Sequence, residues 1–390
     1  MQGLLFHGSG CLFPYEPRKK NYRYTNEETK YVFKEMAFSV LKPLGPVIKR
    51  IPERLPEVAI LESATASLYA PEHMTSGWSN KWTADLHLAL QWAHIQPSII
   101  YEDNLLTGKK IENVKVIFLP GCEALSENVL NKLLELQKQG VILIGDEFLL
   151  SALMPDYRVT SVQRTSDPVK SKAELQKLGR EIADVLKGHY DSPIDASDPD
   201  IVLRRRGNDS ADYLFIVNDK RTFGDYLGPW KLVMEKGLPV SGTVTVGHPV
   251  KAMYDLVRHT PLDFKNTEKG ITFPVEVAPG DGKMLLLLDQ RIASLDLLVP
   301  DQTPARKEPF SLTCSALDET GSEIRAILPM EVRIADADGI VLPGSGFYAA
   351  ENGRLVINEI LAPNMSPGKV TVTVKDLASG LAIQKTFAVR

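Results

Sequence analysis

The stretch Val58-Ala59-Ile60-Leu61, which Glu62 and Ser63 follow directly, decides the fold class of this chain. Four apolar residues in a row, without the polar alternation of a half-exposed strand, are typical of a parallel strand that helices cover on both faces. Apolar side chains recur at helical spacing over residues 81–95 and predict the crossover helix after this strand. We therefore expect an α/β unit to begin close to this stretch.

The residues that follow repeat the alternation of strand and helix. The pattern predicts further strands at 98–101, 116–119 and 141–144, and helices over 126–139 and 172–186. This order is typical of a doubly wound, flavodoxin-like parallel sheet with helices on both faces.

Beyond a linker at 192–199 the apolar period changes to two, which indicates antiparallel strands. The predicted strands of a first β-sandwich are 213–217, 242–246, 271–275 and 284–288. Those of a second, immunoglobulin-like sandwich are 310–313, 330–334, 355–357 and 370–374. The Pro-containing break at 300–304 predicts few contacts between the two sandwiches, so that each would fold separately.

The opening residues predict a short strand at 4–7 and a helix that Thr25 caps and that ends before Pro43. Its apolar stripe would consist of Tyr31, Met36, Val40 and Leu41. The expected division of the chain is therefore a terminal segment at 1–50, the α/β domain at 51–190, and sandwiches at 200–298 and 305–390.

Composition argues against several classes of function. The net charge of −4 gives no attraction to nucleic acid, and the run at 204–206, three arginines, is explained by a polar sheet edge. Cys11, Cys122 and Cys314 lie too far apart for metal-ligand spacing, and no G-x-G-x-x-G follows the first strand. We expect no cofactor, no metal and no membrane span. The compartment depends on an upstream export signal: extracytoplasmic with one, cytoplasmic without.

Carboxylates follow three of the predicted parallel strands or their turns. Ligands of such sheets bind beyond the carboxyl ends of the strands. Neighbouring carboxylates there can shift one another's pKa and serve as acid and base. Glu62, Asp146 and Glu147 are accordingly the catalytic candidates, although such groups can equally bond to loop amides and helix N-termini. Cys122, in the turn after 116–119, is a weaker candidate because no base can be assigned to it.

Aromatic residues in predicted loops offer flat surfaces on which a sugar ring could stack. Trp78, Tyr226 and Trp230 are the carbohydrate-binding candidates. Trp82 and Trp92 share one face of the crossover helix, which core packing explains equally well.

The segments 58–63, 82–91, 116–120 and 140–144 together resemble the class I glutamine-amidotransferase-like domain that forms the trimerisation domain of family-42-type β-galactosidases. The catalytic Cys of true amidotransferases follows the last of these strands, where this chain has Gly145-Asp146-Glu147. The resemblance therefore implies that amidotransferase chemistry is absent. It also implies that 1–50 is similar to the end of a (β/α)8 barrel, whose catalytic carboxylates would lie on strands outside this chain.

The function that this resemblance implies is a non-catalytic accessory or oligomerisation portion of a glycoside-hydrolase-like protein. Its partners would be further copies of the chain or a catalytic barrel, with carbohydrate as the ligand of the parent protein. Two alternatives remain open: a stand-alone hydrolase that uses the candidate carboxylates, and a carbohydrate-binding module that uses the loop aromatics.

Overall fold

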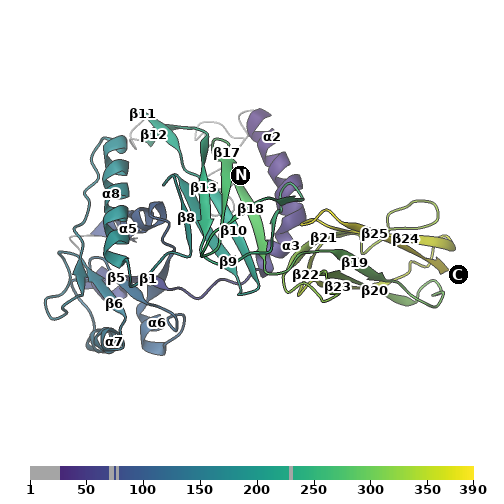
Figure 1. Cartoon of the computed structure of the whole chain (residues 1–390), viewed down its shortest axis with the longest axis horizontal. Helices are drawn as coiled ribbons and strands as arrows, with labels where there is room; N and C mark the ends of the chain where they lie inside the picture. The colour runs from purple at the N-terminus through teal and green to yellow at the C-terminus, as the bar shows by residue number, and fades with distance from the viewer. Residues whose placement is uncertain (1–26, 70–73, 76–78, 228–231) are drawn as a thin grey trace, which may run out of the picture.

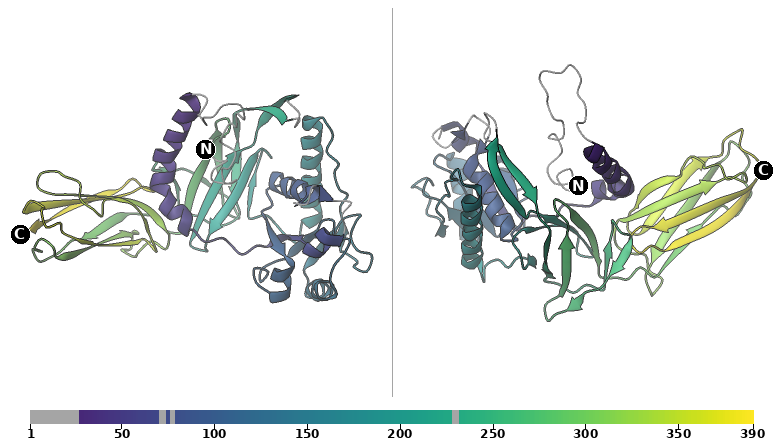
Figure 2. Two further views of the ribbon diagram at one scale, coloured as in Figure 1. Left: turned by 180° about the vertical axis from the view of Figure 1, so that it is seen from behind. Right: turned by 90° about the horizontal axis from the view of Figure 1, so that it is seen from above.

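The computed structural model describes residues 27–69, 74–75, 79–227 and 232–390 of the chain (Figure 1). Three units follow one another: an α/β unit, a central β-sandwich and a C-terminal β module. The α/β unit and the C-terminal module lie at opposite ends of the molecule in each view (Figures 1 and 2). Within the described residues, no helix is both long enough and apolar enough to cross a membrane.

A parallel sheet of five strands forms the centre of the α/β unit; the sequence predicts four of them, and β7 was not predicted. Its order is β4-β1-β5-β6-β7, and every neighbouring pair is parallel. The strands are β1 (Val58–Glu62), β4 (Pro97–Tyr101), β5 (Val116–Leu119), β6 (Ile142–Gly145) and β7 (Tyr157–Arg158). The short strands β2 (Met74–Thr75) and β3 (Ser79–Asn80) pair separately.

Helices cover both faces of this sheet. Because successive residues of a strand point to opposite sides, neighbouring residues of β1 pack against different helices. Ile60 packs in one apolar cluster with α5 (Lys81–Trp92) and α8 (Pro168–Leu186). Leu61 packs in another with α6 (Glu102–Thr107) and α7 (Glu127–Lys138). The short helix α4 (Ala64–Tyr69) follows β1.

Helix α8 begins four residues before the predicted start at 172. Asp167 caps it by accepting hydrogen bonds from the amides of Val169 (3.0 Å) and Lys170 (3.1 Å). Pro168 occupies the first turn, where its missing N–H leaves no hydrogen bond unmade.

Two antiparallel sheets make up the central sandwich. The first contains β9 (Ile201–Gly207), β10 (Ala211–Asn218), β14 (Ala252–Asp255), β15 (Thr260–Leu262) and β18 (Gly282–Leu288). The second contains β8 (Ile194–Ala196), β13 (Val240–Val246), β16 (Lys265–Asn266) and β17 (Ile271–Val277). A hairpin of β11 (Arg221–Leu227) and β12 (Leu232–Gly237) projects beside them.

The C-terminal module also consists of two antiparallel sheets. One contains β19 (Ser294–Leu298), β20 (Pro309–Leu317) and β23 (Arg354–Ile360). The other contains β21 (Leu328–Ala335), β22 (Gly346–Ala350), β24 (Gly368–Asp376) and β25 (Ala382–Val389). β19 precedes the break at 300–304 but pairs with β20 beyond it. The chain is thus an α/β unit followed by antiparallel sheets, as predicted.

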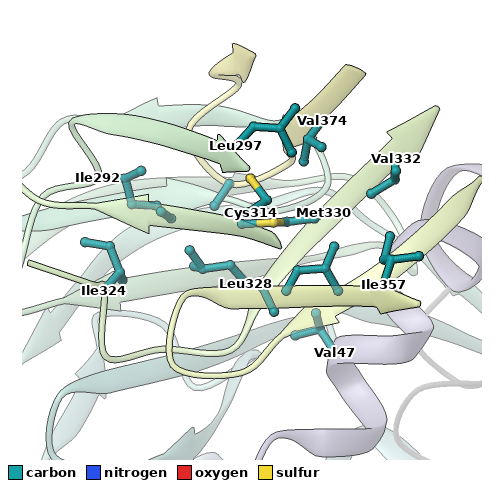
Figure 3. Packing of buried hydrophobic residues seen from close by; sticks show 14 of the residues in the cluster. Val47, Ile292, Leu297, Cys314, Ile324, Leu328, Met330, Val332, Ile357 and Val374 are labelled. Atoms are coloured by element: carbon teal, nitrogen blue, oxygen red, sulfur yellow. The ribbon is translucent and has the colours of Figure 1, made fainter. Parts of the chain in front are cut away.

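The expectation of few contacts across 300–304 is wrong. β10 and β18 are buried on both faces, which is unusual for a strand of a two-sheet sandwich. Their inner side chains meet the second sheet, whereas Tyr213, Phe215 and Leu286 on the outer face join one apolar cluster with the C-terminal module. Figure 3 shows the module's part of this cluster together with Val47. Apolar patterning reveals that a face is buried but not which unit covers it.

The helix that opens the described chain is longer than predicted. α2 (Glu27–Met36) continues through a π-helical turn, η1 (Ala37–Leu41), into α3 (Lys42–Arg50). Pro43 therefore does not end it, because a proline is tolerated in the first turn of α3. Met36 and Val40 are buried as predicted, but Tyr31 and Leu41 are exposed. The strand predicted at 4–7 lies outside the described residues.

Candidate functional site at the carboxyl edge of the parallel sheet

The parallel sheet brings the predicted carboxylates to one edge. Glu62 ends β1, Asp146 and Glu147 follow β6, and Cys122 lies in the turn after β5, between them. Glu102, which the sequence analysis missed, follows β4 at the same edge.

Asp146 is buried and receives hydrogen bonds from two other segments and from its own turn. Its Oδ2 accepts from the indole Nε1 of Trp82 (2.9 Å) and from the amide of Gly121 (2.6 Å), and its Oδ1 accepts from the amide of Phe148 (2.9 Å). The carboxylate thereby joins the start of α5 and the turn after β5 to the end of β6. Each of its oxygens is occupied by a protein donor.

Burial raises the pKa of Asp146, and the hydrogen bonds from Gly121, Phe148 and Trp82 offset only part of that effect. A raised carboxyl pKa is found in general acids, but a general acid must also reach its substrate. Asp146 is 1% exposed. Its arrangement is that of a carboxylate that holds a turn together.

Glu147 and Glu62 are more accessible than Asp146. The Glu147 carboxylate accepts hydrogen bonds from the amide of Ser161 (3.0 Å) and from its hydroxyl (2.5 Å). Ser161 itself lines a hollow of about 490 Å³ between residues 158–163 and α8. Glu62 is half-buried at the end of β1. Glu147 is thus the predicted carboxylate that binds a residue of this hollow.

Glu102 joins β4 to β1 at this edge. One carboxylate oxygen accepts from the hydroxyl of Ser63 (2.5 Å) and the other from the hydroxyl of Thr65 (3.0 Å). Ser63 also accepts a hydrogen bond from the amide of Ala66 and so caps the short helix α4. The position of Glu102 directly after the apolar strand β4, like that of Glu62 after β1, is the sequence signal that could have revealed it.

Cys122 has the wrong environment for a nucleophile. The thiol is fully buried, and burial together with the charges of Asp146 and Glu102 raises its pKa above the ordinary range. Because the thiolate is the reactive form, this environment suppresses reactivity. In the described part of the chain, no group of three His, Cys, Asp or Glu side chains could hold a metal ion.

The aromatic candidates divide into two groups. Trp82 and Trp92 are buried in the apolar cluster of the α/β unit, which agrees with core packing. Trp78 and Trp230 lie outside the described residues, and for Tyr226 only the backbone position in β11 is described. A sugar-stacking platform therefore stays a prediction.

No protein-family model and no curated protein matches this sequence. Solved structures do resemble it over about two thirds of the chain. A GH42 β-galactosidase from G. stearothermophilus matches with a TM-score of 0.43 and 11% identity, over 69% of this chain and 45% of that protein. A β-galactosidase from Bacillus circulans sp. alkalophilus gives 0.43 and 12%, over 67% and 44%. An α-L-fucosidase from Paenibacillus thiaminolyticus gives 0.48 and 11%, over 68% and 53%. This chain thus spans about half the length of these proteins.

Proposed function

We propose that this chain is a non-catalytic accessory portion of a glycoside-hydrolase-like protein, in which the α/β domain makes contacts with other copies of the chain. In this proposal the segment 1–50, the α/β domain 51–190, and the sandwiches 200–298 and 305–390 serve as a scaffold. The resemblance in sequence to the β-galactosidase trimerisation domain supports it, as does the chemistry of the sheet edge. Carbohydrate would be the ligand of the parent protein rather than of this scaffold.

The observation that carries the proposal is the saturated carboxylate of Asp146. It occupies the place where the resemblance puts the catalytic Cys of an amidotransferase. Its oxygens accept hydrogen bonds from Trp82, Gly121 and Phe148, and the nearby Cys122 thiol is held in its unreactive form. An edge in which the polar groups already bind one another has few left for a substrate.

Enzyme assays test the absence of catalysis. We expect the purified chain to hydrolyse neither nitrophenyl glycosides nor glutamine. Activity that Glu147→Gln abolishes and Cys122→Ala retains would contradict the proposal and favour a hydrolase that uses the sheet edge. Asp146→Asn should lower the melting temperature more than Glu147→Gln, because Asp146 is the buried member of the two.

Exposed apolar side chains near the same edge support contacts between copies. Leu68 and Tyr69 of α4 are 76% and 74% exposed, and Tyr101 and Leu106 at β4 and α6 are 56% and 47% exposed. The hydrogen bonds of Glu102 with Ser63 and Thr65 hold α4 beside the start of α6. We name these four apolar residues the edge patch. We propose that their side chains form one apolar patch, which is typical of protein interaction sites.

Molar mass measured by light scattering tests this surface. We expect the chain to form oligomers at micromolar concentration and the double variant Tyr101→Asp, Leu106→Asp to lower the mass. Ile340→Asp is the matched control, because Ile340 is 62% exposed on the loop between β21 and β22, far from the edge patch in the fold (Figure 1). A wild-type chain that remains monomeric would contradict the oligomer contact, whatever the outcome of the enzyme assays.

A further inference from the structure

The two junctions between the units differ in chemistry. The central sandwich and the C-terminal module share one apolar cluster, which also includes Leu44 and Val47 of α3. The α/β unit has apolar clusters of its own, and among the described residues of the sandwich strands only Val202 packs against one of them. Polar contacts therefore dominate at the second junction.

A cluster around Lys172 of α8 forms the centre of that polar junction. The Lys172 Nζ lies 2.6 Å from Asp200 Oδ1 and 3.5 Å from Asp219 Oδ2, and 5.3 Å from the centre of the Trp92 ring. Trp92 donates its indole N–H to Asp219 (3.0 Å), and Gln176 donates to Asp200 (3.1 Å). The side chain of Lys172 is 12% exposed. We name these five residues the polar latch.

Further polar contacts lie between the end of α5 and the sandwich. The His94 ring nitrogen Nδ1 lies 2.6 Å from Asp195 Oδ1, and the amide of Arg205 donates to the side-chain carbonyl of Gln96 (2.9 Å). Like the contacts of the polar latch, these contacts join polar groups of the two units, and water can solvate those groups once the units separate.

Only two stretches of chain connect the α/β unit to the sandwich, and both are fixed at each end. In the first, Arg54 is held by Asp212 of β10 (2.6 Å), while the carbonyl of Glu57 accepts from the amide of Lys115 (2.7 Å) next to β5. In the second, Tyr190 packs in the α/β unit and Ile194 in the sandwich. The lengths between these anchors are 55–56 and 191–193, and each contains a proline. Within the second, the Ser192 hydroxyl donates to the carbonyl of His94 (2.7 Å) in the α/β unit, and the carbonyl of Pro193 accepts from the amide of Gly247 (2.9 Å) in the sandwich, so the turn falls at the link between Ser192 and Pro193.

We propose that the α/β unit turns as a rigid body about 55–56 and 191–193, and that the polar latch holds it in the position of this structure. The sandwich, α3 and the C-terminal module would move together as the other body. Opening the polar junction returns its charges to water, which offsets much of the lost attraction. Opening the apolar junction would expose the outer face of the sandwich sheet to water, at a free-energy cost of about 25 cal/mol per Å² of apolar surface. Hinge motion is thus expected at the polar junction.

Distances between spin labels in the full chain test this proposal. One label at Asn131→Cys in α7 and one at Lys369→Cys in β24 span the polar junction, in a background of Cys11→Ser. The other cysteines, Cys122 and Cys314, are buried and stay in place. We expect a single narrow distance distribution in the otherwise wild-type chain. Lys172→Met should broaden or shift it, because Asp200 and Asp219 then lose their shared cation.

Two controls separate hinge motion from general loosening. Lys177→Met removes a lysine from the same helix that pairs only with Glu181 among the contacts described, and should leave the distribution unchanged. Labels at Glu276→Cys in β17 and at Lys369→Cys cross the apolar junction and should keep a narrow distribution in every variant. Should Lys172→Met fail to fold, Asp200→Asn removes the same 2.6 Å contact. A latch variant that folds and keeps the wild-type distribution, or equal broadening at both junctions, would overturn the proposal.

Discussion

The hydroxyl of Tyr213 makes two hydrogen bonds to the backbone of Ile327. It donates to the Ile327 carbonyl (2.7 Å) and accepts from the Ile327 amide (2.8 Å). Tyr213 belongs to β10 of the central sandwich, whereas Ile327 directly precedes β21 of the C-terminal module. Inside a mainly apolar junction, this pair fixes how the two units face each other.

Tyr213→Phe should therefore destabilise the chain by about 2 kcal/mol, because it leaves a backbone N–H and C=O without their partner. Chemical denaturation of both proteins measures this difference. Tyr157→Phe is the matched control, since its hydroxyl makes one exposed contact with His189 (3.3 Å) and should change stability little. Equal unfolding midpoints for Tyr213→Phe and the wild-type chain would show that water replaces the tyrosine hydroxyl.

A chain truncated after Leu298 should not behave as an independent folded protein. Its β19 would lose the partner β20, and Phe215, Met284 and Leu286 would lose the apolar side chains that cover them. We expect strong binding of a hydrophobic dye and aggregation on size-exclusion chromatography. A monodisperse product whose remaining units melt as in the full chain would contradict a shared core.

Gly179→Ala should destabilise the α/β unit despite the higher helix propensity of alanine. A Cβ at this position of α8 would lie 2.3 Å from the carbonyl oxygen of Ala89 in α5, so the helices must move apart. Overpacking of this kind costs about 1–3 kcal/mol, more than the ~1 kcal/mol that propensity contributes.

Gly45→Ala provides the control for this substitution. Gly45 lies inside α3 with nothing within 4 Å of the added Cβ, so alanine should stabilise the chain by up to ~1 kcal/mol. Thermal melting of the two variants should therefore shift in opposite directions. A shift to higher temperature in both would mean that the α5–α8 contact is not tight.

The buried carboxylate of Asp212 should make stability fall in acid. Burial alone would raise the pKa of Asp212, but the hydrogen bond from His248 and the charges of Arg205 and Arg54 outweigh it and lower the pKa. A carboxyl group whose pKa is lowered in the folded state stabilises the fold at pH values above its pKa in the unfolded chain, about 3.9. That contribution is lost as the pH falls through the folded pKa.

Asp212→Asn should destabilise the chain by about 3 kcal/mol at pH 7, because it leaves Arg54 and Arg205 without their anion. The difference from wild type should shrink as the pH falls below 4. Unfolding free energies measured between pH 7 and pH 3 test both statements. Asp209→Asn is the control, since Asp209 is fully exposed at 3.5 Å from Arg54. A difference that does not depend on pH would contradict the assigned role of the charge.

Local patterns were enough to predict the four longer strands of the parallel sheet and the helices α5, α7 and α8, but not the short elements α4, α6 and β7. The run 116–119 matches β5, and the helix predicted over 126–139 corresponds to α7. Parallel strands covered on both faces are continuously apolar, so their period and order identify a doubly wound sheet without further information. The position of Asp146 and Glu147 at one sheet edge followed from the same order.

The partners of these side chains could not be predicted in the same way. Asp146 binds Trp82, which lies 64 residues away, and Tyr213 binds Ile327 at a separation of 114 residues. The role of Glu102, the burial that suppresses Cys122, and the cover over the outer face of β10 depend equally on contacts between distant segments. Periodicity, which reflects neighbours within a few residues, determined the secondary structure and the order of the units. Only the tertiary structure decided which charges are paired and which faces meet, because hydrogen bonding and burial depend on distance in space and not on distance along the chain.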